Sequence, residues 1–197
     1  MIQLSERLLA MEESATIAMS RKSRELKAQG KDVISLSLGE PDFNTPQFIK
    51  DAATEAMDNN FTKYMPVPGY DDLRESISNK FKRDNNLNYD KDQIVVSTGA
   101  KQSIANVVLT LINPGDEVII PAPFWVSYIE IVKVAGGIPI LVNAGIDKDF
   151  KIDGKDLENA ITAKTKLMIF STPCNPTGSV YNRSELRDLA DVIKKHP

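Results

Sequence analysis

Residues 166–178 read KLMIFSTPCNPTG, and this stretch is the starting point for predicting the fold. A short apolar run at 166–170 is followed by two prolines and a glycine, which stop regular structure within a few residues. A strand that ends in such a rigid turn presents its polar side chain, Asn175, at a fixed place. In an open α/β sheet this place is the carboxyl edge, where ligands bind.

Strand and helix patterns alternate through the part of the chain around this stretch. Continuous apolar runs such as Val118-Ile119-Ile120 are typical of strands that helices cover on both faces. The predicted fold class is therefore α/β, with a mostly parallel, doubly wound sheet and flanking helices. The pattern predicts strands at 93–97, 117–120, 138–142 and 167–170, and helices at 101–112, 125–135, 153–161 and 182–195.

The first ninety residues are predicted to be more irregular. Residues 1–13 show no clear period and are interpreted as an arm. A helix is expected at 14–30 with Ser14 as its cap, and a strand at 33–38. Thr45 and Pro46 suit the cap and first position of a helix that runs to about residue 60. The pattern of 71–83 predicts a helix with one buried face, formed by Leu73, Ile77 and Phe81.

Composition restricts the class of protein. The 197 residues are 42% hydrophobic and 26% charged with a net charge of −3, which is ordinary for a globular chain and does not suggest a nucleic-acid surface. The single cysteine excludes an internal disulfide and fits a reducing compartment. No apolar run approaches a membrane span and the N-terminus carries no signal pattern, so we expect a cytoplasmic protein without a membrane partner.

Three segments that follow predicted strands carry candidate chemistry. Residues 97–103 lie between a strand and a helix start, where free N–H groups favour an anion, most often phosphate; an ordinary tight turn is an equal alternative. Trp125 is either a flat platform for a planar ring or a core anchor. Asn175 either binds a ligand or caps its own turn. Taken together, the three would meet a phosphorylated planar cofactor.

Other chemistry has less support. Cys174 is the only cysteine and His196 the only histidine, and no nucleophile–base pair is evident between them. Cys174 is interpreted as a small buried neighbour and His196 as a solvated terminal residue. Histidines and cysteines are too few for a metal site.

A set of motifs in this order resembles the class I aminotransferases of fold type I, and within them the bacterial aspartate aminotransferases. The resemblance covers nearly the whole chain from about Leu4. The motifs are Gly39-Glu40-Pro41-Asp42-Phe43, Tyr64, Ser97-Thr98-Gly99-Ala100-Lys101-Gln102, Pro114-Gly115-Asp116-Glu117-Val118, Trp125 and Asn175-Pro176-Thr177-Gly178.

The resemblance implies pyridoxal 5′-phosphate as cofactor. Gly99, Ala100 and Lys101 would form the phosphate cradle, the last two through backbone N–H groups. Trp125 would stack on the pyridine ring, and Asn175 would hydrogen-bond the ring's phenolic oxygen. Both residues would also lie beside the substrate.

Two residues nearer the N-terminus complete the implied site. Gly39 would offer its backbone N–H to the substrate carboxylate as the N-terminal segment closes. Tyr64 would reach the phosphate of the neighbouring subunit, which implies a homodimer. The bonds before Pro123 and Pro176 are candidates for cis peptides that would fix the turns carrying Trp125 and Asn175.

The implied reaction moves an amino group between an amino acid, aspartate first, and a 2-oxo acid such as 2-oxoglutarate, by a ping-pong mechanism. Residues 1–45 would contribute to the small domain, and 46–197 would be the first part of the large cofactor-binding domain. The family's Schiff-base lysine is expected after Pro197, so no catalytic residue is assigned here and the isolated chain is expected to be inactive. Glu12 stands where some relatives carry a lysine linked to larger dicarboxylate substrates.

Three alternatives remain open at this point. The same fold hosts cofactor-dependent β-lyases and decarboxylases. The chain could be a non-catalytic binding fragment. A nucleotide-binding α/β domain is the weakest of the three.

Overall fold

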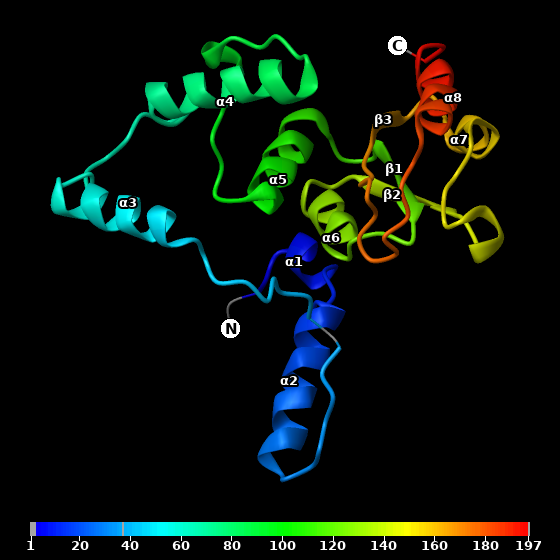
Figure 1. The fold of residues 1–197 in the computed structure, drawn as a ribbon. Coiled ribbons are helices and arrows are strands. Elements are labelled where there is room, and N and C mark those ends of the chain that lie inside the picture. Colours follow the sequence, from blue (N-terminus) through cyan, green and yellow to red (C-terminus); the bar gives the residue numbers. More distant parts are fainter. Residues whose placement is uncertain (1–2, 37, 197) are drawn as a thin grey trace. The chain divides into compact units, whose positions relative to one another are not determined.

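The computed structural model describes residues 3–36 and 38–196. The chain divides into two compact units, one formed by Met1–Ser37 with Lys101–Pro197 and the other by Leu38–Ala100. Each unit is described by itself below (Figure 1). The predicted division into residues 1–45 and 46–197 stays a prediction.

The larger unit contains a parallel sheet of three strands in the order β2-β1-β3. The strands are β1 (Glu117–Ala122), β2 (Ile138–Asn143) and β3 (Thr165–Met168). The central strand β1 pairs with β2 from Glu117↔Ile138 onward and with β3 at Glu117↔Thr165, with an irregularity before Val118. The chain thus leaves β1 to one side and returns to its other side, which confirms the predicted α/β class with a parallel sheet.

Helices connect and cover these strands (Figure 1). Along the chain, α5 precedes β1, α6 connects β1 to β2, α7 connects β2 to β3, and α8 follows β3. Their bounds are α5 (Ala100–Leu111), α6 (Ser127–Val134), α7 (Gly154–Ala160) and α8 (Arg183–Ile193), with a short 3₁₀ turn, η2 (Ile146–Lys148), after β2. The predicted elements from 101 onward are therefore confirmed, with ends shifted by at most two residues.

The central strand is buried on both faces. Val118, Ile119 and Ile120 are each 0% exposed. Because successive side chains of a strand point to opposite faces, Ile119 packs into a cluster with α7 and α8, while Val118 and Ile120 pack with α5 and α6. Burying each such side chain contributes about 1.5–3 kcal/mol, so β1 anchors two cores at once.

The N-terminal part of this unit consists of two helices. Helix α1 (Glu6–Leu9) falls within the predicted arm, and α2 (Ala15–Ala28) matches the predicted helix. Ser14 occupies the cap position of α2, but its side chain makes no capping hydrogen bond. Gly30, at φ +77°, follows the helix end as expected for a left-handed stop.

The unit of residues 38–100 contains α3 (Gln47–Asp58), α4 (Asp71–Asn85) and a 3₁₀ turn, η1 (Lys91–Gln93). Pro46, predicted at the first helical position, stands instead at the cap of α3, one residue earlier. The predicted buried face of α4 is also wrong in part. Leu73 is exposed, Ile77 and Phe81 are half-buried, and the buried residue of this helix is Arg74.

Arg74 is the organising side chain of this small unit. Its guanidinium donates to the Lys91 carbonyl oxygen at 3.0 Å and pairs with the carboxylates of Asp71 and Asp92. Lys91 pairs with Asp71 in turn at 2.9 Å. A charged residue is tolerated at a buried position when partners satisfy it, which explains why apolar spacing alone gave the wrong face.

Two predicted strands do not form. Residues 94–97, and 33–36 with 38, have no regular secondary structure and no ladder pairing, while Ser37 lies outside the described residues. A strand is defined by hydrogen bonds to a neighbouring strand, and the three paired strands here pair with one another. Val96 N–H instead donates to the carbonyl oxygen of Pro68 at 2.9 Å.

Within residues 3–36 and 38–196, none of the helices combines the length and the apolar character that crossing a bilayer requires.

Candidate functional site

The turns that follow β1 and β3 lie against each other. Because the two strands are parallel neighbours, their carboxyl ends reach the same edge of the sheet. The thiol of Cys174, in the turn after β3, donates to the carbonyl oxygen of Pro123, in the turn after β1, at 3.4 Å. The structure thus brings the Trp125 turn and the Asn175 turn together, as the strand pattern predicted. Cys174 is half-buried and serves as a link between turns.

The Asn175 turn is held by its own backbone. Cys174 N–H donates to the Ser179 carbonyl oxygen at 2.9 Å, and Gly178 N–H donates to the Cys174 carbonyl oxygen at 2.8 Å. Asn175 N–H donates to Ser171 Oγ at 3.3 Å. The Asn175 side chain is exposed, and its amide group makes no hydrogen bond with any residue that the structure describes. The amide therefore does not cap its own turn and is available to a ligand.

Both predicted cis peptides are present. The bonds Ala122–Pro123 and Asn175–Pro176 are cis, and so is Thr172–Pro173, which was not predicted.

Trp125 combines the two interpretations that the sequence left open. It is half-buried and packs on the cluster that includes Tyr128, whose ring meets the indole edge-on at 5.6 Å between centroids and 89° between planes. Lys101 Nζ lies 4.9 Å from the indole centroid, within cation–π range. Trp125 is thus anchored in the core and still has part of its surface exposed.

The start of α5 has the features of an anion site. Helix α5 begins at Ala100, and the first N–H groups of any helix lack intrahelical partners. Gly99 precedes it at φ +90°, a conformation that favours glycine, and a Cβ placed there would have no atom within 4 Å. Gly99, Ala100 and Lys101 are all exposed. The open space beside Gly99 and the backbone N–H groups of the exposed Ala100 and Lys101 are features that suit a phosphate.

Gly39 and Tyr64 belong to the unit of residues 38–100, where both are exposed. Their predicted roles toward substrate and toward a neighbouring subunit stay predictions.

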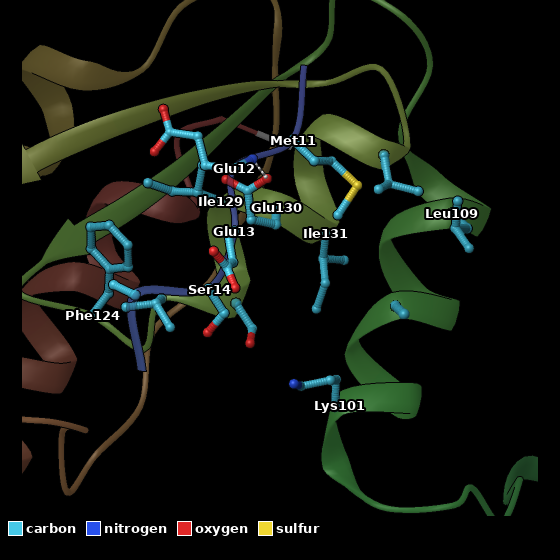
Figure 2. A pocket seen from close by; sticks show the side chains of 15 residues that line it. Met11, Glu12, Glu13, Ser14, Lys101, Leu109, Phe124, Ile129, Glu130 and Ile131 are labelled. Atoms are coloured by element: carbon cyan, nitrogen blue, oxygen red, sulfur yellow. Dashed lines mark hydrogen bonds between the residues drawn. The ribbon is translucent and has the colours of Figure 1, made fainter. Parts of the chain in front are cut away.

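A cavity of about 490 Å³ lies beside the Trp125 turn (Figure 2). Sequence reasoning missed it, because its walls come from segments more than eighty residues apart. Lys101 lines it from α5, and Phe124 and Glu130 line it from the turn after β1 and from α6. Residues 11–15 form another wall, and Glu12 N–H donates to Glu130 Oε2 at 3.2 Å. Mostly apolar walls with a few charged groups are typical of small-molecule sites.

Tyr181, which follows the Asn175 turn, supports it from the core. Its backbone N–H donates to Thr172 Oγ1 at 3.0 Å, and its phenol oxygen accepts from Ile152 N–H at 2.8 Å. Burial raises the pKa of the Tyr181 phenol above its ordinary value. The phenol thus stays neutral and keeps its hydrogen bond at physiological pH.

His196 and Cys174 bond to different partners. His196 contacts Glu158 Oε1 at 2.9 Å and is ion-paired to it when charged, whereas the Cys174 thiol bonds to the carbonyl oxygen of Pro123. The contact with His196, together with Lys195, lowers the pKa of the Glu158 carboxyl. In the described part of the chain, no three histidine, cysteine or acidic side chains are grouped so that they could hold a metal.

The family described as "Aminotransferase class I and II" matches residues 31–197. A probable aspartate/prephenate aminotransferase of Rickettsia bellii is 51% identical over 98% of this chain and 49% of its own length. The aspartate/prephenate aminotransferase of Nitrosomonas europaea is 50% identical over 100% of this chain and 49% of its own. This chain spans about half the length of these relatives.

Solved structures agree. The aspartate aminotransferase from Thermus thermophilus with maleate superposes with a TM-score of 0.95 at 41% identity, over 100% of this chain and 51% of that one. The aspartate aminotransferase from Rhizobium meliloti superposes with a TM-score of 0.95 at 38% identity, over 100% and 49%.

Proposed function

Because this chain belongs to the class I and II aminotransferase family, we propose that it is the N-terminal part of an aspartate aminotransferase that uses pyridoxal 5′-phosphate. The reaction moves the amino group of aspartate to a 2-oxo acid such as 2-oxoglutarate. The observation that carries the proposal is the contact between the turns of Trp125 and Asn175 at one sheet edge, in a chain about half identical to aspartate/prephenate aminotransferases.

The described residues fit this cofactor. The exposed Asn175 amide, which no hydrogen bond among the described residues occupies, offers a donor to an oxygen on a planar ring. The open space beside Gly99 and the backbone N–H groups of the exposed Ala100 and Lys101 at the start of α5 suit a phosphate. Trp125 offers an indole face, and a ring stacked there either displaces the Lys101 ammonium or uses the opposite face.

The cofactor, when bound, supplies the electron sink that makes loss of the substrate α-proton possible. The residues of this chain bind and orient. Ala100 and Lys101 would hold the phosphate through backbone N–H groups, and Trp125 would stack on the ring. Asn175 would donate to the ring oxygen and lie beside the substrate carboxylate. The Schiff-base lysine lies outside residues 1–197 in this proposal, so the isolated chain has no turnover.

The substrate range has a separate argument. The relatives named above are called aspartate/prephenate aminotransferases, which favours prephenate as a second substrate. Glu12, however, is exposed beside the cavity and stands where some relatives carry a lysine linked to larger dicarboxylates, so it offers no cation to the second carboxylate of a substrate longer than aspartate. We therefore propose aspartate as the preferred amino donor and weak use of prephenate.

The first experiment measures amino transfer from aspartate to 2-oxoglutarate by the full-length protein. Oxaloacetate and glutamate should appear together. Release of pyruvate or carbon dioxide without a new amino acid would instead support a lyase or decarboxylase of the same fold. Turnover by residues 1–197 alone would contradict the placement of the lysine.

The second experiment tests the cofactor residues. Trp125→Ala and Asn175→Ala should weaken pyridoxal 5′-phosphate binding, followed by the cofactor's absorbance, by roughly ten-fold or more each, the factor that 1.4 kcal/mol represents. Trp125→Phe keeps a flat ring and should lose less. If Trp125→Ala lowered the free energy of unfolding strongly and left cofactor affinity unchanged, Trp125 would be a core residue only.

The third experiment tests Glu12. Glu12→Lys should raise kcat/KM for prephenate relative to aspartate by several-fold, because it replaces a repulsive charge with an attractive one. Glu6→Lys, an exposed charge reversal on α1, is the matched control and should leave the ratio unchanged.

A further inference from the structure

Residues 11–15, called the strap here, connect α1 to α2 and form one wall of the cavity (Figure 2). Two polar contacts hold the strap. Glu13 pairs with Arg21 of α2 at 2.7 Å, which is a local contact between exposed groups. Glu12 N–H donates to Glu130 Oε2 of α6 at 3.2 Å, across 118 positions of sequence. Among the polar contacts of the described residues, the second is the one that ties the strap to α6.

Glu130 is well placed to make this tie. Its side chain is 22% exposed, in the first turn of α6. One carboxylate oxygen, Oε1, accepts from Lys133 Nζ at 3.1 Å. The other oxygen, Oε2, accepts the bond from the strap backbone, which Figure 2 shows as a dashed line between Glu12 and Glu130. The Glu130 side chain thus presents one acceptor oxygen to the strap backbone.

We propose that Glu130 is a positioning residue, whose carboxylate holds the strap against α6 and thereby sets the wall of the cavity opposite Lys101. The effect on substrate rests on the proposed function. The effect on the strap does not, because it follows from the hydrogen bond and the burial alone. A rival explanation is that α1, which packs against α6, holds the strap without any help from Glu130.

Three variants of the full-length protein separate these explanations. Glu130→Ala removes the acceptor, Glu130→Gln keeps a neutral acceptor oxygen, and Lys133→Met removes the ion pair but leaves the acceptor. The measurement is amide hydrogen exchange at Glu12, with the amides of β1 as a reference for global stability. We expect exchange at Glu12 to be roughly ten-fold faster or more in Glu130→Ala, and near the original rate in the other two.

Two results would overturn the proposal. Unchanged exchange at Glu12 in Glu130→Ala would mean that α1 packing alone holds the strap. Equal acceleration in Lys133→Met would mean that the ion pair, rather than the hydrogen bond to Glu12, sets the local order. If Glu130→Ala failed to fold, acceleration of exchange in Glu130→Gln or in Lys133→Met would still contradict the proposal.

The consequence for catalysis is read from steady-state kinetics. Glu130→Ala should raise KM for aspartate several-fold with a smaller change in kcat, and Glu130→Gln should restore KM. A faster Glu12 amide with an unchanged KM would overturn the link between the strap and the substrate. If the unsubstituted full-length protein had no transferase activity, the proposed function would be refuted. The hydrogen-exchange data would still test whether Glu130 holds the strap.

Discussion

Tyr181→Phe is the substitution whose cost the structure defines most closely. Tyr181 is 7% exposed, and its phenol oxygen accepts from Ile152 N–H at 2.8 Å, where Ile152 is 2% exposed. The variant keeps the ring, and so keeps the edge-on contact with Phe170 at 5.6 Å. It leaves one buried N–H group without an acceptor. Such a group costs about 1–3 kcal/mol, so the free energy of unfolding should fall by that amount.

The pH dependence gives a second, independent signature of Tyr181. Burial raises the pKa of its phenol, so the neutral form is favoured in the folded state. The resulting stability is fully present below the pKa of an unfolded tyrosine, about 10, and is lost as pH rises through the higher folded pKa. Tyr181→Phe should therefore flatten the decline of stability that the original protein shows above pH 10.

Urea unfolding of the full-length protein at pH 7.5 and 10.5 measures both effects. Tyr89→Phe is the control, because Tyr89 is 46% exposed and its ring contact with Phe81 survives the change. It should shift stability by less than about 0.5 kcal/mol. If Tyr181→Phe shifted stability no more than this control, the hydrogen bond to Ile152 would not be a stabilising one.

Three further substitutions test other parts of the fold by chemical unfolding. Ile119→Ala empties a fully buried position and should cost about 2–5 kcal/mol; a loss below 1 kcal/mol would contradict the packing of β1. Gly69→Ala should destabilise the 38–100 unit by about 1 kcal/mol or more, because φ is +103° and the new Cβ would lie 2.7 Å from Val96 Cγ2. If the variant resisted proteolysis as well as the unsubstituted protein does, this prediction would be refuted. The Asn182 side chain caps α8 by accepting from two N–H groups at 2.9 and 3.0 Å. Asn182→Ala should therefore lower the free energy of unfolding by about 1 kcal/mol, whereas Asn182→Asp should leave it unchanged.

The sheet could be predicted from the sequence because its strands carry their own signal. The run at 118–120 is apolar without alternation, which indicates cover on both faces, and all three residues are buried. The cap and glutamate spacing at 182–185 likewise marks the start of α8. The segments at 33–38 and 93–97 have similar patterns but do not pair. Pairing depends on a neighbouring strand, which local sequence does not reveal.

The site was predictable only in its parts. Parallel strands imply that the turns after β1 and β3 meet, and the Cys174–Pro123 contact bears this out. The roles of Gly39, Tyr64, Gly99, Ala100, Lys101, Trp125 and Asn175 toward cofactor and substrate stay predictions. The contact between Lys101 and Trp125 and the bond from Glu12 to Glu130 had no local signal, since each joins residues far apart in sequence.

The strand order β2-β1-β3 also affects how the protein emerges from a ribosome. β1 and β2 are synthesised in succession and can pair early, but the other edge of β1 has no partner until residues 165–168 have been made. Ile119 also lacks α8, which completes its cluster, until residues 183–193 have followed. An open edge beside uncovered aliphatic side chains invites pairing with other nascent chains. Slowing translation just before β3 should therefore increase the nascent chain's demand for chaperones.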